Sequence, residues 1–478
     1  MSSELQSRLD QLSPAEAWAE YVPSAEQPWN TARVAHLYRR TAWGGSWQQI
    51  QDGVELTPRD LISTLVKGSN CPAEAVTCQA QMESFEKDCA RLKSSALETG
   101  SINDLKWLWA YRMLLSPRPF VEKMTLFWHN HFATSQAKVR NHKLMQRQIE
   151  TLRAKALGNF GEMLREMTFD PAMILWLDAA SNRRGAPNEN YAREVMELFS
   201  LGVGHYTEKD IQEAARALTG WKVKNDAAVF TKSDFDEGTK TVLGQTGPFK
   251  AEEIVQICLT QPACPMWITR KLFRELVSEA VHPSDSLLQP LADGFRAKGL
   301  DIGWLVETMV RSQLFFSDLA IHQRVKAPYE FLIGIVRGLE GRVGYPDLVS
   351  AADLLGQSLF HPPSVKGWDG GTEWINASTL LKRQNVAFDW TRGQDRMARL
   401  DPVRMCDRYK AQSASEIAEL FLNIFHQQAE PTVKDSLVEQ MELDARKPEN
   451  AFSAAGRRAA MARTAAHLAL TLPEFQLD

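Results

Sequence analysis

Apolar residues recur every three or four positions along most of this chain, and this spacing predicts a mostly helical protein. The clearest examples are residues 101–115, 120–132, 141–157, 190–201 and 207–218. Gly202 and Gly204 follow one of these segments and are typical helix stops. Thr207, with Asp210 three residues later, approximates a capping box at the start of another. We therefore expect an all-α fold class in which nearly all regular structure is helix.

One segment departs from the helical spacing. β-Branched residues around positions 229–231 and 239–242 flank a stretch rich in Asp and Gly at 234–238. Such runs on either side of turn residues are typical of a hairpin. The sequence therefore predicts one small β-hairpin near residues 227–243.

Composition and charge narrow the class of protein. The 478 residues carry 55 Lys and Arg against 59 Asp and Glu, for a formal net charge of −4. A nucleic-acid binder normally shows a basic excess, so we expect no nucleic-acid partner. No stretch approaches 18 uninterrupted apolar residues, so we expect no membrane span.

The N-terminal sequence and the six cysteines suggest a location. The chain begins MSSELQSRLD, without a basic start followed by an apolar stretch, so we expect a cytoplasmic protein. Cys71, Cys78 and Cys89 are close enough in sequence to form a disulfide, but reduced thiols are favoured in that compartment. No C-x2-C pair is present, which argues against a structural zinc site.

Several segments together match a known pattern. They are Ala35–Arg40 with Gly44, Lys123–Phe132, Pro187–Gly204, Ala215–Trp221, Pro362–Trp368 and Trp374–Asn376. On these segments the chain resembles the domain-of-unknown-function 1800 family, a group of uncharacterised bacterial helical proteins, over roughly residues 33 to 390. The resemblance implies one helical architecture. Similar proteins are often exported. They are also often encoded beside a family related to sulfatases and alkaline phosphatases, so the resemblance implies a partner of that kind.

This chain departs from the family pattern in two places. It shows no export signal, and it has Phe235-Asp236 where the family often has His-Asp. For domain organisation, we expect an N-terminal helical region at residues 1–100 and a helical core carrying the family motifs at 101–400. A C-terminal helical region is expected at 401–478.

The first candidate for chemistry is the pair His129 and His131. Residues two apart on a helix point about 200° from each other, so both rings can bind one metal ion only where the helix breaks. The helix is expected to end near Phe132, which allows His131 to face a cleft. The alternative is a pair of hydrogen-bonded structural histidines between aromatic residues.

The second candidate is the helix that begins at Asn190. Asn190, Glu194 and Glu197 share one face of this helix, with Arg193 beside Glu197. Two carboxylates a turn apart can hold a hard cation, or one can act as a general base. The alternative is a solvated face with an ordinary Arg–Glu pair. We predict that His131, Arg193, Glu194 and Glu197 are catalytic and line one pocket.

Five residues are candidates for substrate binding. They are His129, Asn190, Asp236, Lys240 and Trp368. Asp236 and Lys240 would present a carboxylate and an ammonium from the hairpin, or else belong to a solvated turn. Trp368 lies in a loop rich in Pro and Gly, where its ring either stacks on a ligand or fills the core.

Two functions remain open from the sequence. The first is an enzyme with a polar cleft, a hydrolase or group-transfer enzyme with metal assistance as one option. The second is a non-catalytic helical binding or assembly protein that serves a partner. Convergence of His129 and Glu194 across a pocket would favour the first. The sequence identifies no cofactor, and a divalent metal ion is the candidate that the paired carboxylates suggest.

Overall fold

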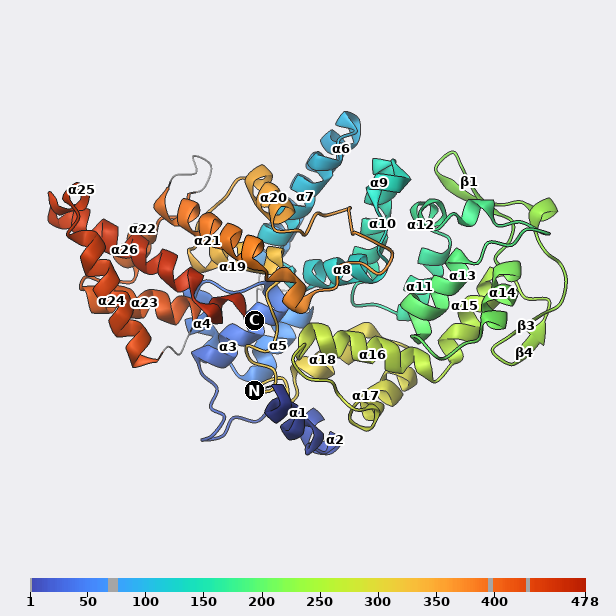
Figure 1. Cartoon of the computed structure of the whole chain (residues 1–478), viewed down its shortest axis with the longest axis horizontal. Coiled ribbons are helices and arrows are strands. Elements are labelled where there is room, and N and C mark those ends of the chain that lie inside the picture. The colour runs from blue at the N-terminus through green and yellow to red at the C-terminus, as the bar shows by residue number, and fades with distance from the viewer. Residues whose placement is uncertain (1, 68–75, 394–398, 427–429) are drawn as a thin grey trace.

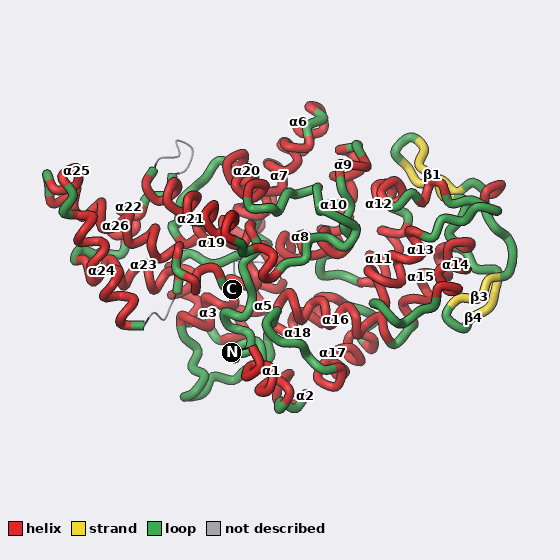
Figure 2. The backbone as a smooth tube through the Cα atoms, viewed as in Figure 1, coloured by secondary structure: helices red, strands yellow, loops and turns green. Residues whose placement is uncertain are grey.

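The computed structural model describes residues 2–67, 76–393, 399–426 and 430–478. Helices account for most of the described chain, and strands are confined to two small antiparallel pairs. The expected fold class is therefore confirmed. Figure 2 shows the strands together at one end of an otherwise helical molecule.

The helices follow one another with short connections. The N-terminal part contains α1 (Ser2–Asp10), α2 (Pro14–Trp18), α3 (Thr31–Ala42), α4 (Trp47–Val54), α5 (Pro58–Lys67) and α6 (Val76–Thr99). The middle part contains α7 (Ile102–Leu115), α8 (Pro119–His131), α9 (Gln136–Val139), α10 (His142–Lys155), α11 (Phe160–Thr168), α12 (Pro171–Trp176), α13 (Asn190–Glu194), α14 (Glu208–Ala217), α15 (Ala251–Thr260), α16 (Ala263–Leu276), α17 (Asp285–Ala297) and α18 (Ile302–Val310). The C-terminal part contains α19 (Pro328–Gly338), α20 (Tyr345–Leu354), α21 (Ala377–Arg392), α22 (Pro402–Arg408), α23 (Ala414–Phe425), α24 (Pro431–Ala445), α25 (Pro448–Ala451) and α26 (Ala454–Thr471).

Five described helical segments are not α-helical. Four are 3-10 turns, η1 (Ala179–Ser181), η3 (Lys232–Asp234), η4 (Gly371–Trp374) and η5 (Pro473–Gln476), and one is the π-helix η2 (Val195–Leu201). The predicted helix over 190–201 is thus α-helical only in its first turn and continues as η2. The capping box of Thr207 and Asp210 is confirmed at the start of α14.

The β structure forms two hairpins rather than one. β1 (Trp221–Lys224) pairs with β2 (Ala227–Phe230), and β3 (Lys240–Val242) pairs with β4 (Gln245–Gly247). The physical reason lies in the turns. Asn225 and Asp226 both have positive φ, as do Leu243 and Gly244, so each pair closes a tight two-residue hairpin. The predicted pairing across residues 234–238 therefore does not occur.

The arrangement places α8 and α16 in the middle of an elongated molecule (Figure 1). Helices α22–α26 lie at one end, and α11–α15 with the four strands lie at the other. α8 packs against α3, α5, α7 and α10, whereas α16 packs against α15, α17, α18 and η2. The centre of the molecule is therefore where segments far apart in sequence meet.

One cluster of buried apolar side chains extends from Leu9 to Phe475. It crosses the expected boundaries near residues 100 and 400, and the three-region division stays a prediction. Within the described residues, no helix combines the length and apolar character needed to cross a bilayer.

The described cysteines are buried. Cys89, Cys258, Cys264 and Cys406 are free thiols. Cys71 and the side chain of Cys78 lie outside what the structure describes, so the expectation about their redox state stays a prediction.

Candidate active site

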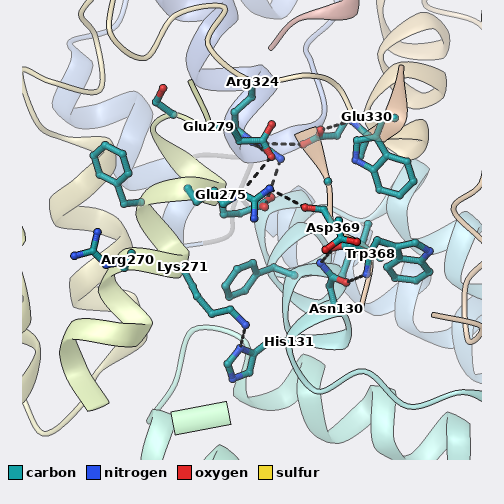
Figure 3. A pocket seen from close by; sticks show the side chains of 18 of the residues that line it. Asn130, His131, Arg270, Lys271, Glu275, Glu279, Arg324, Glu330, Trp368 and Asp369 are labelled. Atoms are coloured by element: carbon teal, nitrogen blue, oxygen red, sulfur yellow. Dashed lines mark hydrogen bonds and ion pairs between the residues drawn. The ribbon is translucent and has the colours of Figure 1, made fainter. Parts of the chain in front are cut away.

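A cavity of about 560 Å³ lies at the centre of the molecule. α8 and α16 line it from two sides, and the loop that ends in η4 contributes Trp368 and Trp374 (Figure 3). The volume is within the usual range for small-molecule sites. The lining combines aromatic rings with six Lys or Arg and four Asp or Glu side chains.

Lys271 and His131 meet inside this cavity. The Nζ of Lys271 lies 3.0 Å from Nδ1 of His131, and Nε2 of His131 lies 3.1 Å from the carbonyl oxygen of Phe199. A carbonyl only accepts hydrogen bonds, so Nε2 carries the proton of the ring. Nδ1 is then an acceptor, to which Lys271 donates. Figure 3 shows the lysine reaching from α16 to this ring.

Burial sets the charge states of this pair. Burial, and then the nearby Lys271 ammonium, hold the pKa of His131 well below its usual value, so the ring is neutral. Burial, and then the nearby Arg274, lower the pKa of Lys271 to about 8. Among the described residues, no carboxylate lies within ion-pair distance of Lys271. Its other contact is the ring of Trp267, whose centroid is 5.2 Å from Nζ.

The π-helix η2 holds both aromatic neighbours of Lys271 through its backbone. The last carbonyls of a helix have no partner within it. Here the carbonyl of Leu198 accepts from the indole of Trp267 at 3.0 Å, and that of Phe199 accepts from His131. η2 is followed by Gly202, where a Cβ would lie 2.8 Å from the Trp267 ring. A glycine is therefore required where η2 meets the wall of the cavity.

Asn130 fixes the opposite wall. Its Oδ1 accepts from the backbone N–H of Trp368 at 2.7 Å, and its Nδ2 donates to the carbonyl of Trp368 at 3.2 Å. This two-point contact anchors the Pro- and Gly-rich loop to α8. The Trp368 side chain is 7% exposed and lines the cavity.

A largely buried ion network forms another part of the lining. Lys123 lies 2.7 Å from Glu330, and Arg324 lies 3.2 Å from Glu330 and 3.4 Å from Glu275. Arg324 also approaches Glu279 at 3.9 Å. Burial opposes ionisation of Glu330, but Arg324 and Lys123 outweigh it and lower its pKa. Burial raises the pKa of Glu275, so this carboxyl keeps a proton more readily than an ordinary glutamate.

A family model described as "Protein of unknown function (DUF1800)" matches residues 36–477. The chain belongs to this family. A search of curated proteins and a search of solved structures each returned no match. In this DUF1800 chain, four of the segments that carry the resemblance reach the cavity. One contributes Asn130 and His131, one Leu198, one Trp368 and one Trp374.

The four predicted catalytic residues are not all together. His131 lines the cavity, whereas its lining does not include Arg193, Glu194 or Glu197. Arg193 forms a two-point ion pair with Glu208, at 2.9 and 2.7 Å. Glu197 accepts from the hydroxyl of Tyr206.

Glu194 and Glu197 do influence each other. Burial, and then the Glu197 carboxylate, raise the pKa of Glu194 to about 7. The two glutamates therefore share a half-buried face, as the sequence suggests. Asn190, at the start of that helix, is exposed. A catalytic role for Arg193, Glu194 and Glu197 stays a prediction.

His129 lies outside the cavity lining, in an aromatic box. Its ring is fully buried against Trp109, Phe360 and Trp368, with centroid distances of 5.4, 6.1 and 5.8 Å. Burial lowers its pKa to about 3, so it is neutral. His129 and Glu194 do not converge across the cavity, so this criterion does not support the enzyme reading.

Asp236 and Lys240 belong to a compact cluster beside the hairpins. Asp236 accepts two hydrogen bonds from Arg216, at 2.9 and 3.1 Å, and Lys240 donates to the backbone carbonyl of Asp236. Lys240 is buried and lies over the ring of Phe235. Phe235 thus occupies the family's frequent histidine position as a packing residue for the lysine. The lining of the central cavity does not include Asp236 or Lys240.

No residue of α16, the helix that carries Lys271, Arg274 and Glu275, was a candidate from the sequence. Trp267, Lys271 and Glu275 recur every four residues on this helix, so they share one face. Mixed charged and aromatic residues at this spacing are equally typical of a solvated face. That face becomes a cavity wall because η2 packs against α16 and α8 lies across the cavity from it. In the described part of the chain, no group of three or more His, Cys, Asp or Glu side chains is arranged to hold a metal ion.

Proposed function

We propose that this protein is an enzyme of the hydrolase or group-transfer class, and that Lys271 transfers a proton in the central cavity. The observation that carries the proposal is the contact of Lys271 with a neutral His131 at 3.0 Å, in a cavity where no described carboxylate pairs with the lysine. Lys271 is half-buried, and an ammonium without a counter-ion is costly to withdraw even partly from water. A structural role would be better served by an ion pair.

The proton affinity of Lys271 supports this role. A pKa of about 8 leaves a useful fraction of both amine and ammonium near neutral pH. Groups with a pKa close to the working pH are the most effective at taking and returning a proton. Glu275 lies one helical turn away with a raised pKa. Lys271 can therefore take up and return a proton, and Glu275 is the nearest titratable group on the same face of α16 to assist it.

His131 positions Lys271 in this mechanism. Its neutral Nδ1 orients the lysine without supplying the negative charge that would raise the lysine pKa. Lys271 and Glu275 replace Glu194 and Glu197 as our first candidates for proton transfer. Metal assistance at Glu194 and Glu197 remains a separate proposal.

The test is a turnover screen with matched variants. Wild type, Lys271→Met, Glu275→Gln and Lys138→Met are assayed against phosphate, sulfate and carboxylate esters, with and without divalent metal ions. Lys138 is the control because it also lies over a tryptophan ring, at 5.7 Å from Trp176, but outside the cavity. We expect Lys271→Met to lower kcat by about 100-fold or more, the usual effect of losing a general acid or base.

Two results would contradict the proposal. One is turnover that survives unchanged in Lys271→Met. The other is no turnover in any arm together with stable capture of a partner protein, which would favour the helical assembly function. The partner class to test there is the sulfatase- or phosphatase-related one that the family resemblance implies.

We also propose a cytoplasmic location with reduced thiols. The four described cysteines are free, which supports a reducing compartment. A disulfide joining Cys71 to Cys78 or Cys89 in protein from native cells, detected by mass spectrometry, would contradict this location.

A further inference from the structure

The charges that line the cavity are unevenly paired. Each of its four carboxylates lies within ion-pair distance of a cation that also lines it, namely Arg324 for Glu275, Arg324 for Glu279, Lys123 for Glu330 and Lys366 for Asp369. Arg270 pairs with Asp285, outside the cavity. Within the part of the chain that the structure describes, no carboxylate pairs with Lys271. The lining therefore has an excess of positive charge, and that excess lies at Lys271.

Arg274 strengthens this positive site. It lies three residues after Lys271 on α16, and the two side chains line the same cavity. Arg274 is tied to the opposite loop, because it donates to the carbonyl of Asp369 at 2.7 Å. Its nearest carboxylate, Glu279, is 3.9 Å away, which is long for a charge-assisted hydrogen bond. A guanidinium has five N–H donors, so Arg274 keeps donors for a ligand.

Aromatic rings form a large part of the remaining wall. Phe127, Trp267, Phe273, Trp368 and Trp374 line the same space. Such rings bind flat or apolar bodies and contribute affinity through buried area. Two of them are held by hydrogen bonds to neighbouring elements: Trp267 through its indole to Leu198, and Trp368 through its backbone to Asn130. The wall is thus preformed around the cationic site.

We propose that the cavity binds an organic anion, with its phosphate, sulfate or carboxylate group against Lys271 and Arg274 and its ring or apolar body against Trp267 and Trp368. This proposal names the substrate class for the proposed enzyme and rests on that function only in using the same cavity. The anion supplies the counter-charge that Lys271 lacks. It also explains why cations from one helix face a space walled by apolar rings.

Binding of simple probes tests the proposal without a known substrate. Isothermal titration calorimetry is run with phenylphosphonate, benzenesulfonate and benzoate, which carry a ring and an anion and are not hydrolysed. Benzyl alcohol supplies the ring without charge, and inorganic phosphate supplies the charge without a ring. The proteins are wild type, Lys271→Met, Arg274→Met and the control Lys138→Met. Arg274 is an exposed side chain, so its variant tests the site even if Lys271→Met fails to fold.

We expect at least one ring-bearing anion to bind about tenfold or more tightly than both benzyl alcohol and inorganic phosphate. Lys271→Met and Arg274→Met should each lose about that factor, whereas Lys138→Met should not. The three anions distinguish phosphate, sulfate and carboxylate ligands. Equal affinity for benzyl alcohol, unchanged affinity in both cavity variants, or no binding of any probe overturns the proposal.

The outcome is separable from the test of catalysis. Selective anion binding with no turnover in any substrate class would support the anion-binding site and contradict the proposed enzyme. Turnover that depends on Lys271, but with neutral substrates only, leaves the enzyme and overturns the anion site.

Discussion

Gly367 lies between two residues of the cavity wall and very close to Asn130 of α8, and its replacement makes a quantitative test. The residue has φ of +86°, and a Cβ built on it would lie 2.1 Å from Oδ1 and 2.4 Å from the carbonyl oxygen of Asn130. These distances are far below van der Waals contact. Gly367→Ala must therefore push the Trp368 loop away from Asn130, or move Asn130 itself.

Two costs add in this variant. A non-glycine residue at this φ costs about 1–3 kcal/mol of strain. Breaking both hydrogen bonds between Asn130 and the Trp368 backbone costs roughly 0.5–1.5 kcal/mol each. Gly204 separates the two costs, because its φ of +91° is similar and nothing lies within 4 Å of its Cβ position. Gly204→Ala pays the strain alone, so Gly367→Ala should be less stable by a further 1–3 kcal/mol or so.

The assay is urea denaturation of both variants, with midpoints compared at equal slope. Calorimetry with the tightest ring-bearing anion follows on the folded proteins. We expect Gly367→Ala alone to weaken that binding, because only this change displaces the wall that carries Trp368. Equal midpoints for the two variants, or full binding by Gly367→Ala, would refute the role of the Asn130 contact.

Three further predictions concern charged groups. Anion binding by wild type should be constant below about pH 7 and weaken as pH rises through 8, because Lys271 loses the proton that attracts the anion. Calorimetry across this pH range measures the decline, which Lys271→Met should not show. Glu330→Gln should destabilise the protein by about 3–5 kcal/mol at pH 7 because it leaves buried cations unpaired. The folded-state pKa of Glu330 is lowered, so the loss of stability in Glu330→Gln should shrink as the pH falls toward that pKa. As a control, Glu162→Gln removes a carboxylate from a surface pair and should leave the urea midpoint unchanged. Glu194→Gln should raise the urea midpoint above that of wild type more at pH 8 than at pH 5.5. The raised pKa of Glu194 means that its ionisation through pH 7 destabilises the fold. Equal midpoints for wild type and variant at pH 8 would contradict this.

The helices were predictable because each depends on nearby residues. The segment 120–132 corresponds to α8 and the segment 207–218 to α14, with its capping box as expected. The hairpins were harder to predict, since the Asp- and Gly-rich stretch at 234–238 is a more conspicuous turn signal than the turns that form. The turns that form use Asn225-Asp226 and Leu243-Gly244, and the second pair begins with a leucine at positive φ. A leucine there is unfavourable locally, so only tertiary contacts select it.

The π-helix was also beyond local prediction. Residues 190–201 have ordinary helical spacing, yet η2 adopts the wider turn over Val195–Leu201. Its carbonyls then meet Trp267 and His131, which lie about 70 residues away in either direction. π-Helical turns occur often at functional sites, where the extra residue redirects side chains or backbone groups. Here the redirected groups are carbonyls, whose direction cannot be read from residue types.

The residues of the candidate site also divide into those that a sequence pattern indicates and those that only the fold brings together. His131, Asn130, Gly202 and Trp368 all lie in segments that the family resemblance includes, and each holds the cavity by a close backbone approach or a fixed hydrogen bond. Such roles demand particular residue types, so they leave a sequence pattern. Lys271 lies outside those segments, and the residues next to it in the sequence give no local signal that it faces a cavity. Its position beside a neutral histidine depends on α8, α16 and η2 meeting at one point, and only the fold specifies that meeting.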